Sequence, residues 1–306
     1  MKFSGCSKRM GAALGAVLAA VSTAASALPV PWQLNMPPGV TKTSQDVYQI
    51  HMWALYVCCV IGVIVFGAMI IAMVKFRKSK GAVPATWSHN TKAEILWTVV
   101  PILILVVLAA PATGVMINMA NTENSQMTVK ITGYQWKWRY EYMNWGDKAY
   151  HVNFVSKLEG ESDRTRQLKS GLDPWAVKKD GENTYLLDVD HPLVLPTDTK
   201  VRFVVTGDDV IHAWWVQDLG VKQDAIPGII NDQWTEIKQP GTYRGQCAEL
   251  CGQDHAFMPI VVKAVPKDEF LKWLDTQETA LAPPPPAAAP AAASSSTTEP
   301  AQAPKT

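Results

Sequence analysis

Two long apolar runs come early in the chain, and short alternating patterns follow them. The runs extend from about residue 52 to 74 and from about 95 to 120, and a bilayer crossing requires about 20 apolar residues. The loop of about 75–94 between them holds five Lys and Arg side chains and a single acid, Glu94. Short basic loops lie on the cytoplasmic side of a membrane. The pattern predicts a transmembrane helix hairpin at 52–120 with both ends outside, which in a bacterium is the periplasm.

A basic and then Ala-rich stretch precedes the first run. Three of the first nine residues are basic, and the short apolar segment after them ends at Ala25-Ser26-Ala27. This order is typical of a secretory signal peptide with a small-residue cleavage site. Residues 1–27 are therefore predicted to be removed, and residues 28–51 to form a periplasmic N-terminal segment.

Beyond residue 120 the pattern becomes that of an all-β domain. Aromatic residues alternate with polar ones in one stretch, at Tyr134, Trp136, Trp138, Tyr140 and Tyr142. This alternation predicts a strand with one aromatic and one polar face. Further strands are expected at 185–189, 200–205 and 260–264, with Pro and Gly turn signals between them. Short strands at this spacing are typical of a Greek-key β-sandwich or barrel.

The rest of the outer domain, residues 121–280, has two parts with different compositions, and a tail follows it. Residues 147–184 are rich in charge and poor in apolar side chains, which predicts a surface excursion. Residues 266–277 are expected to form a short closing helix. Residues 281–306 are mostly Pro, Ala, Ser and Thr and are predicted to be a disordered tail.

The charge of the outer domain excludes one class of partner. Residues 126–275 carry 18 Lys and Arg against 22 Asp and Glu, which is modestly acidic. Binding of nucleic acid would require basic clustering. A mildly acidic surface instead favours basic partners through electrostatic steering.

The residues best suited to metal chemistry lie between positions 247 and 258. Cys247, Cys251, His255 and Met258 supply two thiols, an imidazole and a thioether, and His212 lies a strand or two upstream. Sulfur ligands combined with imidazole suit copper, and a weak thioether ligand marks copper sites that transfer electrons. Two thiolates can also bridge two metal ions, with one His and Met258 on one ion and the other His and a backbone carbonyl on the second. The set predicts a site that passes electrons singly.

Three other interpretations of the cysteine pair remain open on the residues alone. Cys247 and Cys251 could form a short-loop disulfide, which an exported protein permits. They could bind a structural zinc ion with His255 and one further ligand. Their spacing is also typical of copper-delivery proteins, so a membrane-anchored periplasmic copper chaperone is the alternative function. The presence of Met258 and His212 favours the copper electron-transfer site.

With these residues the chain resembles subunit II of the haem–copper cytochrome c oxidases, in its bacterial, aa3-type form with a CuA centre. The resemblance extends from about residue 49 to 273. It rests on five motifs: Glu94-x-x-Trp97-Thr98, Gln135-Trp136-x-Trp138, Asp209-Val210-Ile211-His212-x-Trp214, Lys222-x-Asp224-Ala225-Ile226-Pro227-Gly228 and Gly245-Gln246-Cys247-x-Glu249-x-Cys251-Gly252-x-x-His255-x-Phe257-Met258-Pro259. The fold that this implies is a two-helix membrane anchor followed by a cupredoxin-like domain.

The resemblance implies a binuclear copper centre and a magnesium ion. The copper ligands would be His212, Cys247, Glu249 through its backbone carbonyl, Cys251, His255 and Met258. The Glu249 side chain would bind Mg²⁺ at the interface with subunit I. The family also carries an exposed tryptophan where electrons arrive from cytochrome c, which corresponds to Trp136. Glu94 corresponds to the carboxylate at the mouth of a proton channel, and the acids that dock cytochrome c correspond to Glu141, Asp190 and Asp209.

The implied function is that of the electron-accepting subunit of a respiratory oxidase. Single electrons would pass from cytochrome c through the coppers to haem in subunit I, where O2 is reduced to water with proton pumping. The complex would be a proton-translocating oxidoreductase, and this chain alone would hold no complete active site. The expected partners are subunit I, subunit III, cytochrome c and the lipid bilayer. The expected location is the bacterial inner membrane, crossed twice, with the C-terminal domain in the periplasm.

Overall fold

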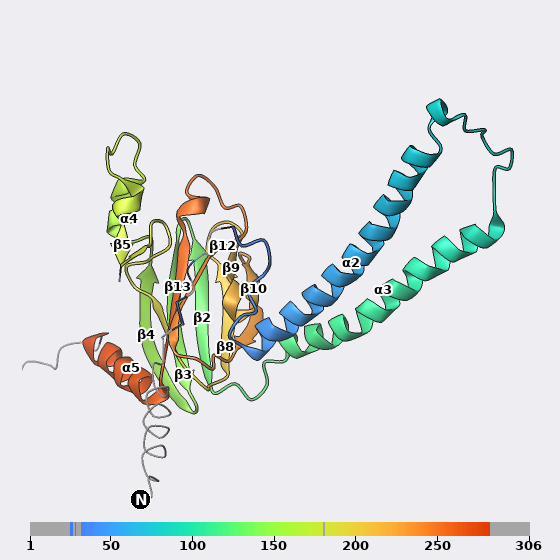
Figure 1. The fold of residues 1–306 in the computed structure, drawn as a ribbon. Coiled ribbons are helices and arrows are strands. Elements are labelled where there is room, and N and C mark those ends of the chain that lie inside the picture. Colours follow the sequence, from blue (N-terminus) through green and yellow to red (C-terminus); the bar gives the residue numbers. More distant parts are fainter. Residues whose placement is uncertain (1–24, 27, 29–31, 180, 282–306) are drawn as a thin grey trace, which may run out of the picture.

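The computed structural model describes residues 25–26, 28, 32–179 and 181–281. Within them, a long helical hairpin extends away from a β domain (Figure 1). Most of the predicted signal peptide and nearly all of the predicted C-terminal tail lie outside the described residues. The exception at the start is the two-residue strand β1 (Ala25–Ser26), which pairs in parallel with Gly241 and Thr242. Cleavage after Ala27 stays a prediction.

Two helices form the hairpin, α2 (Lys42–Lys75) and α3 (Thr91–Ala120), and a 3₁₀ turn, η1 (Lys78–Lys80), lies in the loop between them. Both are long and apolar enough to cross a membrane, and neither is buried within the chain. Apolar residues surround each helix on all sides, which is typical of a segment that lies in lipid or against other helices. The predicted membrane hairpin is therefore confirmed in the fold.

Helix α2 begins ten residues before the apolar run does. Residues 42–51 of the predicted N-terminal segment, 28–51, are therefore helical. The cause is a capping box that an apolar pattern does not reveal. Thr41 Oγ1 accepts from the Ser44 backbone N–H at 3.0 Å, and Ser44 Oγ accepts from the Thr41 backbone N–H at 3.0 Å. These bonds satisfy amide donors that a helix start leaves free. Thr41 Oγ1 also donates to the Leu219 carbonyl at 2.9 Å, which attaches the helix start to the β domain.

The β domain is a sandwich of two sheets with a small separate hairpin. One sheet has the order β11-β8-β2-β3-β4, and the other has the order β10-β9-β12-β13-β7 with β1 beside β12. The strands of the first sheet are β2 (Met127–Tyr134), β3 (Lys137–Trp145), β4 (Lys148–Ser156), β8 (Val201–Gly207) and β11 (Asn231–Thr235). Those of the second are β7 (Leu193–Pro196), β9 (His212–Val216), β10 (Val221–Ala225), β12 (Gly241–Cys247) and β13 (Pro259–Val265). The predicted membrane-anchored all-β, cupredoxin-like class is confirmed.

Alternating side chains bring the two sheets together. β8 alternates between fully buried and half-buried positions along its whole length, as expected of a strand with one face on the core. Large rings fill the space between the sheets: Phe203 lies 5.1 Å from Trp214, centroid to centroid, and Trp214 Nε1 donates to the Tyr140 hydroxyl at 3.3 Å. The predicted strands at 200–205 and 260–264 are confirmed as β8 and β13. The predicted closing helix is α5 (Lys267–Leu281).

The single aromatic strand expected at 134–142 was wrong in one respect. Tyr134 ends β2, Gln135 and Trp136 form the hairpin turn, and the aromatic strand β3 begins at Lys137. Alternation of aromatic and polar residues continues through this turn, and no Gly or Pro marks it, so periodicity alone could not show the reversal. Within β3 the predicted alternation holds, with Trp138 fully buried.

Two other predictions also needed correction. Residues 185–189 are no strand: Leu186 has φ 63°, and the Leu187 N–H donates to the Thr184 carbonyl at 2.9 Å in a turn. The charged stretch at 147–184 is not wholly an excursion, because residues 148–156 form β4 at the edge of the first sheet. Tyr150 and Val152 are buried on its inner face, and the strand itself carries a single charge, Lys148, so it was concealed by the charged residues that follow it in the stretch. The excursion begins after β4. It contains the short helix α4 (Gly160–Thr165), the 3₁₀ turn η2 (Pro174–Ala176) and the two-stranded hairpin β5 (Lys178–Lys179) and β6 (Glu182–Asn183).

Candidate metal centre

The predicted copper ligands come from neighbouring parts of one sheet. His212 opens β9, Cys247 closes β12, and the loop 248–258 leads from β12 to β13. β9 and β12 are antiparallel, with Cys247 opposite Trp214. Side chains two positions apart share a face of a strand, so His212 and Cys247 point to the same side at one end of the sheet.

Backbone hydrogen bonds close this loop. The Cys247 N–H donates to the Met258 carbonyl at 3.1 Å, and the Ala248 N–H donates to the Ala213 carbonyl at 3.0 Å. Further along, the His255 N–H donates to the Gly252 carbonyl at 3.2 Å, where the 3₁₀ turn η4 (His255–Phe257) begins. The first and last predicted ligands of the loop are therefore held together by the backbone before any metal binds.

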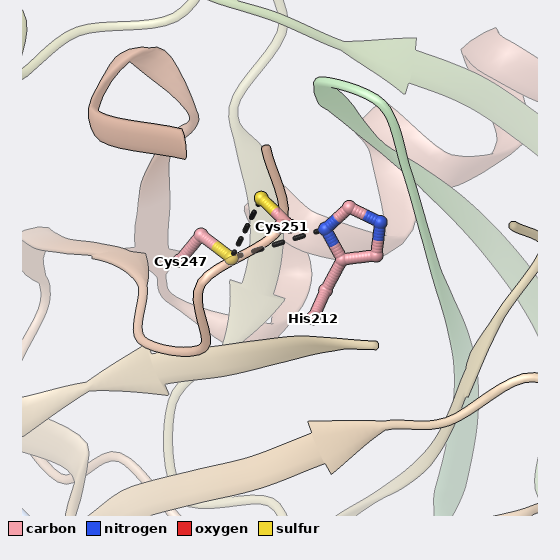
Figure 2. A group of neighbouring side chains, drawn as sticks. All are labelled: His212, Cys247 and Cys251. Carbon is pink, nitrogen blue, oxygen red and sulfur yellow. Dashed lines mark hydrogen bonds between the residues drawn. The ribbon is translucent and has the colours of Figure 1, made fainter. Parts of the chain in front are cut away.

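Figure 2 shows three of the side chains converging. Cys247 Sγ lies 3.8 Å from Cys251 Sγ and 3.9 Å from His212 Nδ1. All three residues are buried, and His212 has 0% of its surface exposed. Both cysteines are free thiols, because a disulfide requires sulfurs about 2.05 Å apart. The geometry does not match the disulfide alternative.

The other predicted ligands surround these three. His255 Nδ1 lies 3.5 Å from Cys251 Sγ, and the Glu249 carbonyl oxygen accepts from Cys247 Sγ at 3.4 Å. The Met258 side chain is buried in the same core cluster as both cysteines. Each sulfur thus has its own imidazole nitrogen beside it. The approach of the Met258 sulfur to the site stays a prediction.

This donor set fits copper. A metal–thiolate bond is about 2.3 Å long, so one ion can contact both sulfurs across their 3.8 Å separation. His212, Cys247 and Cys251 form a group whose ligand atoms all lie within 4.8 Å of one another. Thiolates and imidazoles favour copper over Mg²⁺ or Ca²⁺, and a buried Met beside them is unlike a structural zinc site, which is closed by thiolates and imidazoles alone.

The two thiols differ in acidity in the metal-free site. Burial acts to raise the pKa of Cys247, but hydrogen bonds with His212 and with the nearby backbone together outweigh it and lower the pKa to about 7. Burial raises the pKa of Cys251 to about 12, and the Cys247 thiolate beside it adds to this rise. Burial acts to lower the pKa of His212, but its hydrogen bonds to Cys247 and Asp209 raise it. Metal ligands must be deprotonated, so metal binding has to displace the Cys251 proton.

Asp209 orients the His212 ring. Asp209 Oδ1 lies 2.9 Å from His212 Nε2, and the carboxylate also accepts from the backbone N–H groups of Gln135 at 2.8 Å and Val210 at 2.6 Å. A carboxylate that takes one ring N–H of a histidine leaves the other nitrogen free for a metal, here Nδ1. Burial acts to raise the pKa of Asp209, but these hydrogen bonds lower it. The sequence pointed to Asp209 only as a docking acid, although its i,i+3 spacing from His212 was a usable signal.

The β2–β3 hairpin tip covers the metal loop. Gln135 Nε2 and Trp136 Nε1 both donate to the Cys251 carbonyl, at 2.9 Å and 3.2 Å. Trp136 is half-buried. Gly252 makes this close approach possible: its φ is +119°, and a Cβ there would lie 3.1 Å from Gln135 Nε2 and 3.2 Å from Trp136 Cζ2. The residue predicted to receive electrons therefore touches the backbone of a predicted copper ligand.

The other predicted functional residues lie apart from this centre. Glu94 is in the first turn of α3, at the end of the hairpin remote from the β domain (Figure 1). Glu141 lies on β3 and forms ion pairs with Lys130 and Arg139 at 3.1 Å and 3.3 Å. Asp190 accepts from the backbone N–H groups of Lys157 and His191 at 2.9 Å and 2.8 Å. The roles of these three acids stay predictions.

Sequence reasoning missed one contact at the site. Arg166, which follows α4, lies 3.2 Å from Asp254 in the metal loop. Arg166 belongs to the charged stretch that had been interpreted as an excursion, and no local pattern links it to a residue 88 positions away.

Comparison with known proteins identifies the same family over both parts of the chain. The family model of the periplasmic domain of cytochrome c oxidase subunit II matches residues 127–265, and that of its transmembrane domain matches residues 29–115. The probable cytochrome c oxidase subunit 2 of Rickettsia bellii is 35% identical over 254 residues, which cover 83% of this chain and 87% of that protein. Cytochrome c oxidase subunit 2 of Cereibacter sphaeroides is 33% identical over 280 residues, which cover 87% and 90%. A similar solved structure is the periplasmic domain of cytochrome oxidase subunit II of Bradyrhizobium japonicum, with 35% identity, a TM-score of 0.43, and coverage of 53% of this chain and 100% of that one.

Proposed function

The chain belongs to the cytochrome c oxidase subunit II family, and on that premise we propose that it accepts electrons from cytochrome c on a binuclear copper centre in its periplasmic domain. It is a subunit of an oxidoreductase complex and is anchored in the membrane by its helical hairpin. The observation that carries the proposal is the pair of free, buried thiols 3.8 Å apart, each with an imidazole nitrogen beside it. A single-copper site would need only one of these thiols.

The proposed ligand set divides between two positions. Bound copper would supply one-electron redox chemistry here. Cys247 and Cys251 would bind both ions, and His212 and His255 would each bind one. The Met258 thioether and the Glu249 carbonyl would complete the set. Asp209 keeps the His212 ring turned so that Nδ1 faces the thiols.

Electrons would reach the site through the hairpin tip. Trp136 is half-buried, and its N–H contacts the Cys251 carbonyl, so the indole joins the domain surface to a ligand's backbone. Acidic side chains at Glu141, Asp190 and Asp209 would dock a basic cytochrome c by steering its encounter. The carboxylate of Glu249 is exposed and would bind Mg²⁺ shared with subunit I.

The remaining parts of the proposal concern the whole complex. Electrons would pass to haem in subunit I, where O2 is reduced to water with proton pumping, which makes the complex a translocase. Glu94, at the cytoplasmic start of α3, would lie at the mouth of a proton channel. Subunits I and III would cover the apolar faces of α2 and α3. The location would be the bacterial inner membrane, crossed twice.

Metal analysis with EPR spectroscopy of the purified full chain tests the copper centre. We expect two coppers per chain that share one unpaired electron. A single copper, or a site that loses its copper readily to a chelator, would instead support the copper-chaperone function. Zinc alone would support a structural site. Either result would overturn the proposal.

A further inference from the structure

The excursion after β4 reaches the metal loop through one arginine. Arg166 Nη1 donates to Asp254 Oδ1 at 3.2 Å, and Nη2 donates to Asp254 Oδ2 at 3.5 Å. The guanidinium also lies over the Phe257 ring, 4.3 Å from its centroid. Asp254 immediately precedes η4, the turn that carries His255, and Phe257 is its last residue. One side chain from outside the loop therefore contacts both ends of this turn.

The arginine is held in place from its own side. Its Nε donates to Asp163 Oδ1 at 2.8 Å, and its backbone N–H donates to the Ser162 carbonyl at 3.0 Å. Ser162 is fully buried, and its Oγ accepts from the Leu186 N–H at 3.2 Å. The guanidinium is thus aimed at the loop by contacts that do not involve the loop. A side chain that is already ordered loses less conformational entropy when it makes a contact.

The two histidines of the site are supported unequally. His212 is fully buried and has the Asp209 carboxylate on its second ring nitrogen. His255 is half-buried, and among the described residues its ring has hydrogen-bond contacts with the two cysteines, Cys251 at 3.5 Å and Cys247, and with no carboxylate. Its position must therefore come from the backbone of η4. The Phe257 N–H donates to the Asp254 carbonyl at 2.9 Å, so these two residues define that turn.

We propose that Arg166 is a positioning residue for His255: it fixes η4 through Asp254 and Phe257, and so keeps the imidazole beside Cys251. The Asp254 side chain makes no hydrogen bond that caps the turn, so its carboxylate serves the contact with Arg166. The side chains of Arg166 and Asp254 are 23% and 24% exposed, which places the pair between a solvated surface pair and a buried one. Stacking of arginine on an aromatic ring adds to its attraction.

The ordering of η4 by Arg166 does not depend on copper. Only the second step, in which an ordered η4 helps to retain the metal, rests on the proposed copper function. The test therefore has a metal-free measurement and a metal-bound one. The variants are Arg166→Gln and Asp254→Asn, which remove the ion pair from opposite sides. Arg166→Lys keeps the charge but loses the paired donors and the flat stacking surface. Arg164→Gln is the matched control, because Arg164 is an exposed arginine of the same helix.

The first measurement is amide hydrogen exchange of the metal-free full chain in detergent. We expect exchange at the Phe257 and His255 amides to become about tenfold faster in Arg166→Gln and Asp254→Asn, to change by an intermediate amount in Arg166→Lys, and to stay at the wild-type rate in Arg164→Gln. A tenfold change corresponds to about 1.4 kcal/mol. If the His255 and Phe257 amides exchange at the wild-type rate in both Arg166→Gln and Asp254→Asn, the proposal is overturned. If Arg166→Gln fails to fold, Asp254→Asn alone decides this measurement.

The second measurement is the rate at which a copper chelator removes the metal from the loaded chain, together with nitrogen couplings in the EPR spectrum. We expect release about tenfold faster in the two ion-pair variants, and a change in one histidine nitrogen coupling while the other stays constant. Unchanged release and couplings despite faster amide exchange would show that Arg166 orders the turn without positioning His255, which also overturns the proposal. A wild-type chain that binds no copper would refute the proposed function, and the amide measurement would still test the contact.

Discussion

The replacement Asp209→Asn tests whether this acid serves the metal site or only a docking surface. The Asp209 carboxylate accepts three hydrogen bonds, from Gln135 N–H, Val210 N–H and His212 Nε2. An asparagine in the same place offers only one oxygen. If that oxygen faces His212 and Val210, the side-chain NH2 opposes the Gln135 N–H. If it faces Gln135, two donors lose their acceptor.

The arrangement that loses only one hydrogen bond sets the expected change in the free energy of unfolding. One lost hydrogen bond costs about 1 kcal/mol of unfolding free energy, and because the Asp209 side chain is 35% exposed, water can replace part of it. The larger effect concerns the metal. A neutral amide oxygen is a weaker acceptor for His212 than the carboxylate, and mutation of a histidine's outer hydrogen-bond partner typically lowers metal affinity about 10- to 100-fold. We therefore expect Asp209→Asn to fold, to bind copper more weakly by that factor, and to show an altered EPR spectrum.

Asp208→Asn is the control for the charge itself. Asp208 immediately precedes Asp209, and its side chain is 47% exposed. It forms an ion pair with Arg139 at 2.8 Å and no hydrogen bond with His212. Copper affinity is measured by competition with a chelator, and docking by the ionic-strength dependence of electron transfer from cytochrome c. We expect both variants to weaken docking and only Asp209→Asn to weaken copper binding. If Asp209→Asn weakens docking as much as Asp208→Asn does, but keeps the wild-type copper affinity and EPR spectrum, the orienting role of Asp209 is refuted.

Three further changes test other parts of the site. Trp136→Phe removes the N–H bond to the Cys251 carbonyl, while the Gln135 bond to the same oxygen remains. We expect copper content and cytochrome c binding to persist and electron transfer to slow in rapid-mixing kinetics; a wild-type rate would mean that electrons arrive elsewhere. Met258→Leu keeps the buried volume but removes the thioether, so we expect a folded domain with a shifted reduction potential by voltammetry, and unchanged potential and spectra would remove Met258 from the ligand set. In the metal-free chain with Cys58 and Cys59 replaced by Ser, thiolate absorbance should rise in two separate steps, one near pH 7 from Cys247 and one near pH 12 from Cys251. Cys247→Ser should abolish the first step and move the second to lower pH, because the Cys247 thiolate contributes to the high pKa of Cys251; a single step for both thiols in the wild type would contradict the assignment.

Local patterns were enough to predict the membrane hairpin, much of the sandwich and the metal loop. The spans are long apolar runs, β8 alternates between buried and half-buried positions, and β13 is a short apolar run. Each of these signals can be detected within a short window. The metal loop was detectable for another reason: five of the six predicted ligands lie within twelve consecutive residues, Cys247 to Met258. His212 lies far away in sequence, and the structure brings it to Cys247 by pairing β9 with β12.

The parts that sequence could not supply depend on contacts between distant segments. Gln135 reaches Cys251 across 116 positions, and Arg166 reaches Asp254 across 88. Such contacts follow from how the sheets pack and not from any local period. The same limit explains β4, which was averaged into the charged stretch that follows it, and the hairpin tip at 135–136, where alternation of residue types ran through a reversal of the chain.

The way in which the metal loop is held bears on electron transfer itself. An electron moves quickly between sites only if the surroundings need little rearrangement when the charge changes. The loop is fixed from separate directions: its ends by the Cys247–Met258 backbone bond, the Cys251 carbonyl by the tip of the β2–β3 hairpin, and η4 by Arg166. These contacts use backbone groups of the predicted ligand residues or side chains of their neighbours, and they leave the ligand side chains free. The proposed ligands would therefore keep their positions in both oxidation states, and the hairpin tip that restrains Cys251 also carries Trp136, the proposed entry point for electrons. On this proposal, restraint and electron access depend on the same two residues, Gln135 and Trp136, and only side-chain changes that spare the Gln135 bond can separate them.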